Sequence, residues 1–378
     1  MIINNVKLVL ENEVVHGSLE MQDGEIRAFA ESQSHLSEAM DGEGGWLLPG
    51  LIELHTDNLD KFFTPRPKVD WPAHSAMSSH DALMVASGIT TVLDAVAIGD
   101  VRDGGDRLEN LEKMINAIEE TQKRGVNRAE HRLHLRCELP HHTTLPLFEK
   151  LVEREPVTLV SLMDHSPGQR QFANREKYRE YYQGKYSLTD AQMQQYEEEQ
   201  LALAARWSQP NRESIAAMCR ARHIALVSHD DATHAHVAQS HQLGSVIAEF
   251  PTTFEAAEAS RKHGMNVLMG APNIVRGGSH SGNVAASELA QLGLLDILSS
   301  DYYPASLLDA AFRVADDQSN RFTLPQAVRL VTKNPAQALN LQDRGVIGEG
   351  KRADLVLAHR KGNHIHIDHV WRQGKRVF

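Results

Sequence analysis

The sequence predicts an α/β protein: a (β/α)8 barrel that carries a small composite β-sandwich domain formed by both termini. Three observations support this fold class. Strand-like segments separated by turn signals fill both ends of the chain. Between them, short apolar segments alternate with helical stretches, the pattern of a parallel sheet covered by helices. Several of the apolar segments also end in His, Asp or Glu, as the strands of a barrel with an active site do.

The two ends of the chain indicate one shared β domain. Asp23-Gly24 is a typical hairpin turn between strand-like segments. Gly348-Glu-Gly-Lys351 lacks the glycine spacing and the Ser or Thr of a phosphate-binding loop, so we interpret it as a turn. We therefore expect residues 1–48 and 342–378 to form the composite β domain, and residues 49–341 to form the barrel.

The middle of the chain supplies the barrel strands and helices. The expected strands are residues 51–54, 90–96, 133–138, 157–163, 224–228, 246–249, 267–269 and 297–300. The expected helices are residues 107–124, 145–154, 189–207, 212–222, 254–263, 285–292 and 306–315. Residues 61–80 form a long connection broken by prolines, and residues 167–188 form a polar insertion rich in tyrosine. Each is either an active-site segment or a solvated surface segment.

Composition limits the function classes. The 378 residues are 41% hydrophobic and 24% charged, as in a soluble globular protein. The formal net charge of −11 argues against nucleic-acid binding, although local cations can still bind an anionic substrate. With only two cysteines, no disulfide framework is expected, which favours a cytoplasmic location. We see neither a signal peptide nor an apolar run long enough for a membrane span.

Polar side chains at the ends of five predicted strands indicate a metal centre. They are His55, Asp57, Glu138, His165, His229 and Asp301. Side chains two residues apart share a strand face, so His55 and Asp57 project together. Because the strand ends of a closed barrel converge, we expect His55 and Asp57 on one divalent ion and His165 and His229 on another. Glu138 would lie between the ions, and Asp301 would touch a metal and act as the base. For any one of these residues alone, an ordinary polar strand end is the alternative.

A glycine-rich segment after the seventh predicted strand suggests an anion site, because loops after strands 7 and 8 often bind phosphate in these barrels. Its glycines expose backbone N–H groups, and arginine can bind phosphate bidentately. The expected substrate-binding residues are Arg276, Gly277, Gly278, Ser279 and His280, together with Lys61 and Arg66 from the first long connection. A mobile loop without a ligand is the alternative.

Two motifs resemble the amidohydrolase superfamily. They are Pro49-Gly-Leu-Ile-Glu-Leu-His-Thr-Asp57 and Gly345-Val-Ile-Gly-Glu-Gly-Lys-Arg-Ala-Asp-Leu-Val-Leu357. The resemblance covers nearly the full chain and implies a metal-dependent (β/α)8 barrel with a composite β-sandwich. It implies one or two divalent ions per chain, with zinc as the expected metal and manganese or iron as alternatives.

The chain departs from the commonest pattern of this superfamily at three positions. Asp57 stands where a second His is usual, Glu53 where Asp is frequent, and Glu138 where many members use a carboxylated Lys. These departures argue against hydrolysis of cyclic amides. Residues 55–61, 163–169, 228–233 and 270–282 more closely resemble the diphosphatase branch of phosphonate utilisation, in the carbon–phosphorus lyase pathway.

The closer resemblance implies a small-molecule substrate, a ribosyl triphosphate phosphonate, cleaved at a phosphoanhydride to release diphosphate. It also implies functional neighbours in the carbon–phosphorus lyase system, and it leaves a homodimer open. No nucleic-acid or membrane partner is expected. Two other function classes stay open at this point. One is a cyclic amidohydrolase or deaminase, which the basic Gly-Ser loop disfavours. The other is a metal-free barrel scaffold, which the six candidate ligands disfavour.

Overall fold

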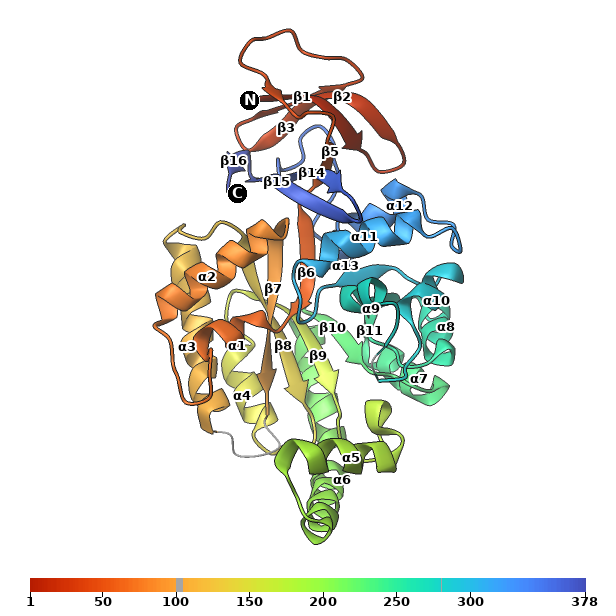
Figure 1. Ribbon diagram of the computed structural model, residues 1–378. Helices are drawn as coiled ribbons and strands as arrows, with labels where there is room; N and C mark the ends of the chain where they lie inside the picture. The colour runs from red at the N-terminus through yellow and green to blue at the C-terminus, as the bar shows by residue number, and fades with distance from the viewer. Residues whose placement is uncertain (100–104, 280) are drawn as a thin grey trace.

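The structure, a computed structural model, describes residues 1–99, 105–279 and 281–378. It confirms the predicted fold class: a nearly closed eight-stranded parallel barrel and a second sheet made from both termini. Figure 1 shows the terminal sheet at one end of the barrel and the helices α5 and α6 projecting from the other. The limits assigned to the two domains stay a prediction.

All eight predicted barrel strands are present, and each pairs in parallel with the next in chain order. They are β6 (Leu51–Thr56), β7 (Ile89–Ile98), β8 (Glu130–Glu138), β9 (Val157–Met163), β10 (Ala225–His229), β11 (Ile247–Glu249), β12 (Asn266–Gly270) and β13 (Ile297–Ser299). Their C-terminal ends point away from the terminal sheet in Figure 1. The strand ends that carry the candidate ligands therefore meet at one end of the barrel.

The first and last strands close the barrel through a few polar contacts. Thr56 forms a parallel bridge with Asp301, and the Asp301 N–H donates to the His55 carbonyl at 3.1 Å. Below this bridge, the fully buried carboxylate of Glu53 accepts from the His55 N–H at 2.8 Å and from the Ser300 N–H at 2.6 Å. Burial raises the pKa of Glu53 to about 7, against the lowering effect of these hydrogen bonds. Glu53 thus joins the backbones that present His55 and Asp301.

The helices surround the barrel. They are α1 (Asn58–Phe63), α2 (Ala73–Ala86), α3 (Gly105–Lys123), α4 (Thr144–Leu151), α5 (Arg175–Tyr186), α6 (Asp190–Ala221), α7 (His234–Leu243), α8 (Phe254–Lys262), α9 (Ala271–Arg276), α10 (Ala286–Gln291), α11 (Ser306–Asp316), α12 (Leu324–Arg329) and α13 (Lys333–Ala338). A 3-10 turn covers Arg170–Phe172. No helix in the described part of the chain is both long and apolar enough to cross a membrane.

The helices α1, α2, α5, α7, α9, α12 and α13 lie outside the expected helical ranges, and a break expected within α6 is absent. Residues 61–80, expected as a long connection broken by prolines, include the end of α1 and the first half of α2. The buried stripe of α2 contains the polar residues His80 and Asp81, which hides its helical periodicity. Residues 208–211, expected as a break, lie inside the continuous helix α6 with Pro210. Buried Asn211 donates to the carbonyls of Leu139 and His141, so tertiary contacts outweigh the intrinsic cost of the proline.

The terminal sheet joins the two ends of the chain in the order β16-β15-β14-β5-β1-β2-β3, and β4 pairs with β1. Its strands are β1 (Ile2–Val9), β2 (Val14–Gln22), β3 (Glu25–Ala30), β4 (Met40–Asp41), β5 (Trp46–Pro49), β14 (Leu355–Lys361), β15 (His364–Arg372) and β16 (Lys375–Arg376). β5 pairs with both β1 and β14, so it connects the N-terminal and C-terminal parts of this sheet.

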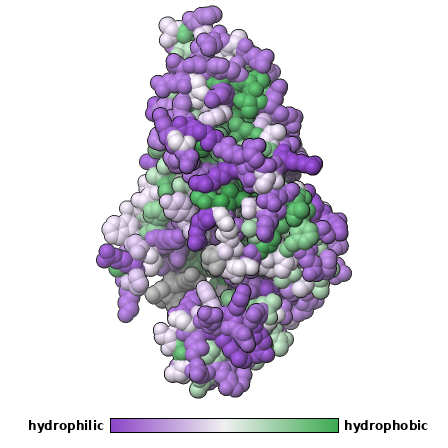
Figure 2. Space-filling view, turned by 45° about the vertical axis from the view of Figure 1, so that its right-hand side comes forward, coloured by the Kyte–Doolittle hydropathy of each residue, from purple (hydrophilic) through white to green (hydrophobic). Residues whose placement is uncertain are grey.

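Most of the molecular face shown in Figure 2 is hydrophilic, with apolar patches between polar areas.

A buried chain of acidic and basic side chains fastens α2 to the outer face of the barrel. Asp94 on β7 contacts His80 Nε2 at 2.6 Å through one oxygen and His131 Nδ1 at 2.8 Å through the other. The opposite nitrogen of His131 lies 2.9 Å from Asp81 Oδ1. All four side chains are almost fully buried. Burial lowers the pKa of His131, but Asp94 and Asp81 outweigh it and raise that pKa to about 9.

This network predicts a pH-dependent stability. A raised pKa means that His131 contributes its full stabilisation below pH 6.5, the ordinary value, and loses it as the pH rises through about 9. We expect this contribution to the free energy of unfolding to fall by on the order of 3 kcal/mol across that window. Urea denaturation of the wild type and of His131→Asn measures it, because the variant lacks the fall. His74→Asn, an exposed change on α2, should behave as the wild type does. Equal pH slopes in the wild type and His131→Asn would contradict the assignment.

Candidate active site

The candidate ligands meet in a cavity at the C-terminal ends of the barrel strands. The cavity has a volume of about 300 Å³ and is lined by His55, Arg136, His165, His229 and Asp301, and by the segment after β12. Four of the six side chains proposed as ligands, His55, His165, His229 and Asp301, line this cavity. The other two contact lining residues: Asp57 Oδ2 lies 3.5 Å from His55 Nε2, and Glu138 contacts His165 from behind.

One group of donor atoms lies at the junction of β6 and β13. His55 Nε2 is 3.5 Å from Asp57 Oδ2 and 3.7 Å from Asp301 Oδ1. Two ligands of a tetrahedral zinc ion, each about 2.1 Å from the metal, lie about 3.4 Å apart. The spacing of these three atoms is therefore suited to one divalent ion. We call His55, Asp57 and Asp301 the first half-site.

A second group of donor atoms comes from β9 and β10. His165 Nε2 lies 3.5 Å from Asp230 Oδ2, and His229 Nε2 lies 3.3 Å from the same oxygen. These distances again match those between ligands of one ion. We call His165, His229 and Asp230 the second half-site. Asp230 directly follows the predicted ligand His229 and is a further ligand candidate.

Glutamates stand behind the histidines of both half-sites. Glu249 Oε1, at the end of β11, lies 2.5 Å from His55 Nδ1 and 3.2 Å from His229 Nδ1. The first contact lacks the angle of a regular hydrogen bond. Glu138 Oε2 lies 2.7 Å from His165 Nδ1. Histidines that bind metals commonly donate their second ring nitrogen to a carboxylate, which fixes the ring orientation. The three imidazoles are thus held with Nε2 towards the aspartates.

The arrangement changes the expectation for Glu138. Its role as a bridge between two ions stays a prediction, but its carboxylate accepts from the backbone and the ring of His165. Glu249 is the carboxylate that lies between a histidine of the first half-site and a histidine of the second. Glu249 ends the sixth predicted strand, so the same strand-end signal that identified the other ligands applies to it.

The charge of the site also suits metal binding. One cation among the inward-facing residues, Arg136, donates to Asp57 Oδ1 at 2.9 Å. The carboxylates are Asp57, Glu138, Asp230, Glu249 and Asp301. Burial lowers the pKa of His55 and His165, but Glu249 and Glu138 outweigh it, raising the pKa of His55 well above its usual value and that of His165 to about 10. Metal ions bind the neutral ring, and with the histidines neutral the five carboxylates and one guanidinium leave four negative charges, which two divalent ions would balance. Buried charges need such compensation.

A third donor group lies deeper in the barrel and is formed by His55, His134 and Glu249. His134 Nδ1 donates to the Leu54 carbonyl at 2.9 Å, which leaves the Nε2 lone pair free. Burial lowers the pKa of His134 to about 4, so the ring is neutral. His134 Nε2 and Glu249 Oε2 are buried without a hydrogen-bond partner among the described residues, and they lie 3.9 Å apart. Such unpaired polar atoms fit a site that accepts a further ligand.

Two aspartates of the half-sites differ in their proton affinity. Burial raises the pKa of Asp57, but Arg136 and His55 outweigh it and hold that pKa well below its usual range. Burial is also the largest influence on Asp301, whose pKa is raised above its usual value. Asp301 lies across the bridge from Thr56 with a left-handed backbone, φ 54°. Asp301 is therefore the better proton acceptor of the two.

The loops that carry the second half-site are tied to α6 and to each other by buried ion pairs. Arg212 on α6 donates to Asp164, next to His165, at 3.3 Å. Arg170 donates to Asp231, next to Asp230, at 3.0 Å, and Ser240 donates to the other oxygen of Asp231. Asp230 itself has a left-handed backbone, φ 56°. Strain of this kind persists when surrounding contacts fix it.

The expected substrate-binding residues divide into three groups. Arg276, Gly278 and Ser279 line the cavity. Lys61 lies near its mouth, where it donates to the Tyr302 carbonyl at 3.3 Å. Gly277 ends α9 and faces a different cavity, Arg66 is exposed in a bridge with Val69, and His280 lies outside the described residues.

Four site residues are absent from the sequence prediction: His134, Arg136, Asp230 and Glu249. His134, Arg136 and Glu138 occupy alternate positions of β8, so strand periodicity alone puts all three on one face. Asp230 directly follows a predicted ligand, and Glu249 ends a predicted strand. Their positions were visible in the sequence, but their pairing with particular histidines depends on the register between strands.

Comparisons with known proteins agree with this geometry. Residues 82–378 match the amidohydrolase family. The chain is 97% identical over all 378 residues to the Escherichia coli (strain K12) protein named α-D-ribose 1-methylphosphonate 5-triphosphate diphosphatase, and the match covers 100% of both chains.

Solved structures share the fold at low sequence identity. N-acetylglucosamine-6-phosphate deacetylase from Thermotoga maritima aligns with a TM-score of 0.60 at 14% identity, covering 100% of this chain and 99% of the other. A Xaa-Pro dipeptidase aligns with a TM-score of 0.66 at 12% identity, covering 99% and 98%. The chain belongs to the amidohydrolase family, as the family match and the full-length relative show and the barrel geometry supports.

Proposed function

We propose that the protein hydrolyses α-D-ribose 1-methylphosphonate 5-triphosphate to α-D-ribose 1-methylphosphonate 5-phosphate and diphosphate, with one divalent ion in each half-site. The paired half-sites beside a glycine-rich basic segment are the observation that carries this proposal. The name of the relative that is 97% identical supports the substrate. Both cysteines are buried and free, which supports a reducing compartment such as the cytoplasm.

Zinc is the metal that we propose, because imidazole nitrogens and carboxylate oxygens at tetrahedral spacing suit it. His55, Asp57 and Asp301 would hold one ion, and His165, His229 and Asp230 the other. Divalent ions bound there would lower the pKa of water and neutralise phosphate charge. Glu249 and Glu138 would keep the histidine rings in place.

The protein groups account for the remaining steps. Asp301, with its raised pKa, would accept a proton from the attacking water. The water oxygen forms a bond to the α-phosphorus, and the bond from that phosphorus to the bridging oxygen breaks, so diphosphate leaves with the electron pair. Arg276, aided by the hydroxyl of Ser279, would bind the departing diphosphate, whereas the Gly278 N–H already donates to the Asn273 carbonyl at 2.9 Å.

Metal content tests the division into half-sites. We expect two zinc equivalents per wild-type chain after loading and desalting, measured by elemental analysis. His165→Ala and His55→Ala should each lose one equivalent, because each histidine belongs to a different half-site. Asp317→Asn, a change on the surface, should keep both. Unchanged metal content in both histidine variants would rule out the assigned ligands.

Product analysis tests the reaction. Phosphorus NMR of the zinc-loaded protein with the ribosyl triphosphate in water labelled with heavy oxygen should show the label in the sugar 5-phosphate. Asp301→Asn should lower kcat by about a hundredfold or more, the range for loss of a general base. Asp317→Asn serves as the matched control. Label in diphosphate would refute attack at the α-phosphorus, and release of single phosphates would refute the diphosphatase reaction.

A further inference from the structure

The insertion between β9 and β10 forms part of the cavity wall. Gln171 lines the cavity, and the Phe172 ring stands edge-on to the His165 ring with centroids 6.2 Å apart. The chain then enters α5, whose first turn is capped by the Asn174 side chain. The start of α5 is therefore attached directly to residues that border the second half-site.

A separate apolar core holds α5 against the start of α6. Its fully or largely buried members are Phe172, Tyr178, Tyr182, Met193 and Tyr196. Buried Glu197 on α6 accepts from Arg175 at 2.7 Å and from Arg179 at 2.5 Å, one on each side of position 177 along α5. These contacts fix the orientation of α5, and with it the face of the helix from which Lys177 projects.

Lys177 is the cation that α5 extends towards the glycine-rich segment. Its Nζ lies 3.7 Å from the point where a Cβ would stand on Gly282. The neighbours of Gly282, Ser281 and Asn283, both line the cavity. Lys177 itself is exposed, and its ammonium has no ion-pair partner among the described residues. An unpaired ammonium beside residues that line the cavity is suited to bind phosphate oxygens.

Lys177 is needed to bind the outer phosphates even though other cations lie around the cavity. Arg136 is paired with Asp57 and lies close to the half-sites. Among the described residues, the Arg276 guanidinium reaches the Tyr302 hydroxyl at 3.5 Å, and the Lys61 ammonium already donates to the Tyr302 carbonyl at 3.3 Å. A triphosphate extends several ångströms beyond the phosphorus under attack and carries charge on each phosphate. Arg276 from α9 and Lys177 from α5 bracket the segment where those outer phosphates would lie.

We propose that Lys177 binds the two phosphates that leave as diphosphate, which makes α5 a substrate-binding element of this site. The inference rests on the proposed function, because it uses the same cleft and the same substrate. If Lys177 has this role, the insertion makes the protein prefer substrates that carry a chain of phosphates over the corresponding monophosphate. Lys177 is a binding residue in this account, and Asp301 keeps the role of base.

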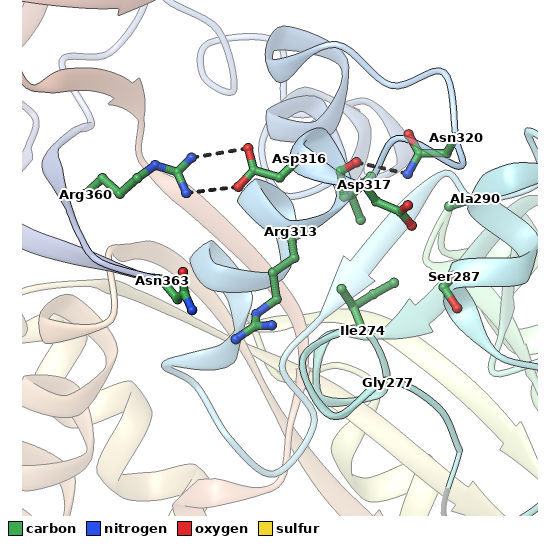
Figure 3. Close-up of a pocket in the computed structure, with 11 residues that line it drawn as sticks. Ile274, Gly277, Ser287, Ala290, Arg313, Asp316, Asp317, Asn320, Arg360 and Asn363 are labelled. Carbon is green, nitrogen blue, oxygen red and sulfur yellow. Dashed lines mark hydrogen bonds and ion pairs between the residues drawn. The ribbon is translucent and has the colours of Figure 1, made fainter.

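A second cavity provides the alternative position for an anion. It lies on another side of α9, has a volume of about 410 Å³ and is lined by Arg313 and Arg360. Figure 3 shows Arg360 bonded to Asp316 through two nitrogens, while Arg313 extends from α11 near Asn363. Arg313 therefore carries the unpaired charge of this outer cavity among the described residues.

Binding of inorganic diphosphate to the zinc-loaded full-length protein, measured by isothermal titration calorimetry, tests the proposal. Lys177→Met should weaken this binding about tenfold, the effect of losing one partly solvated charge-assisted contact. The same variant should raise the KM for the triphosphate by a similar factor. Lys177→Arg should stay close to wild type, because it keeps the charge.

Two matched variants serve as controls. Lys185→Met removes the same charge from the other end of α5, and Arg313→Met removes the free charge of the outer cavity. Both should bind diphosphate as the wild type does. Any of three results would overturn the role of Lys177. They are wild-type affinity in Lys177→Met, no diphosphate binding by the wild type, and an equal loss of affinity in Lys185→Met.

A loss of affinity only in Arg313→Met would move the anion to the outer cavity. Wild-type protein that binds diphosphate but does not cleave the triphosphate would instead refute the proposed function.

Discussion

Closure of the barrel between β6 and β13 is the constraint on which the rest of the site depends. The two strands come from opposite ends of the barrel sequence, yet His55, Asp57 and Asp301 form one half-site across their junction. The buried carboxylate of Glu53 holds this junction through the N–H groups of His55 and Ser300. A buried acid with two backbone donors is costly to disturb, so the geometry of the first half-site follows from the closure.

The second half-site depends on the first through Glu249. One oxygen of this carboxylate lies close to Nδ1 of both His55 and His229. Because both rings point their Nε2 atoms at aspartates, a single buried carboxylate orients histidines of both half-sites. Arg136 offsets part of the acidic charge while pairing with Asp57. The centre therefore combines a strongly acidic metal-binding layer with basic residues placed further out, at α9 and α5, where phosphates would extend.

Much of this structure could be predicted from the sequence because it depends on local patterns. Alternation of apolar strands and helices predicted all eight barrel strands, and polar strand ends located His55, His165, His229 and Asp301 at one cleft. The roles of Glu138 and Glu249 could not be separated in this way, because the partner of a carboxylate is set by strand register and side-chain direction. The continuous helix through Pro210 and the helical start of α2 depend on buried tertiary contacts. Helix propensity alone does not predict these tertiary contacts.

The most direct test of the account is a crystal structure of the zinc-loaded protein with anomalous diffraction data collected at the zinc edge. The account predicts two anomalous peaks, one among His55 Nε2, Asp57 and Asp301, and the other among His165 Nε2, His229 Nε2 and Asp230. Glu249 and Glu138 should remain on the Nδ1 side of the histidines. A single anomalous peak would contradict the assignment of two half-sites. So would peaks bound by Glu138, or by the deeper group of His55, His134 and Glu249, in place of the two half-sites.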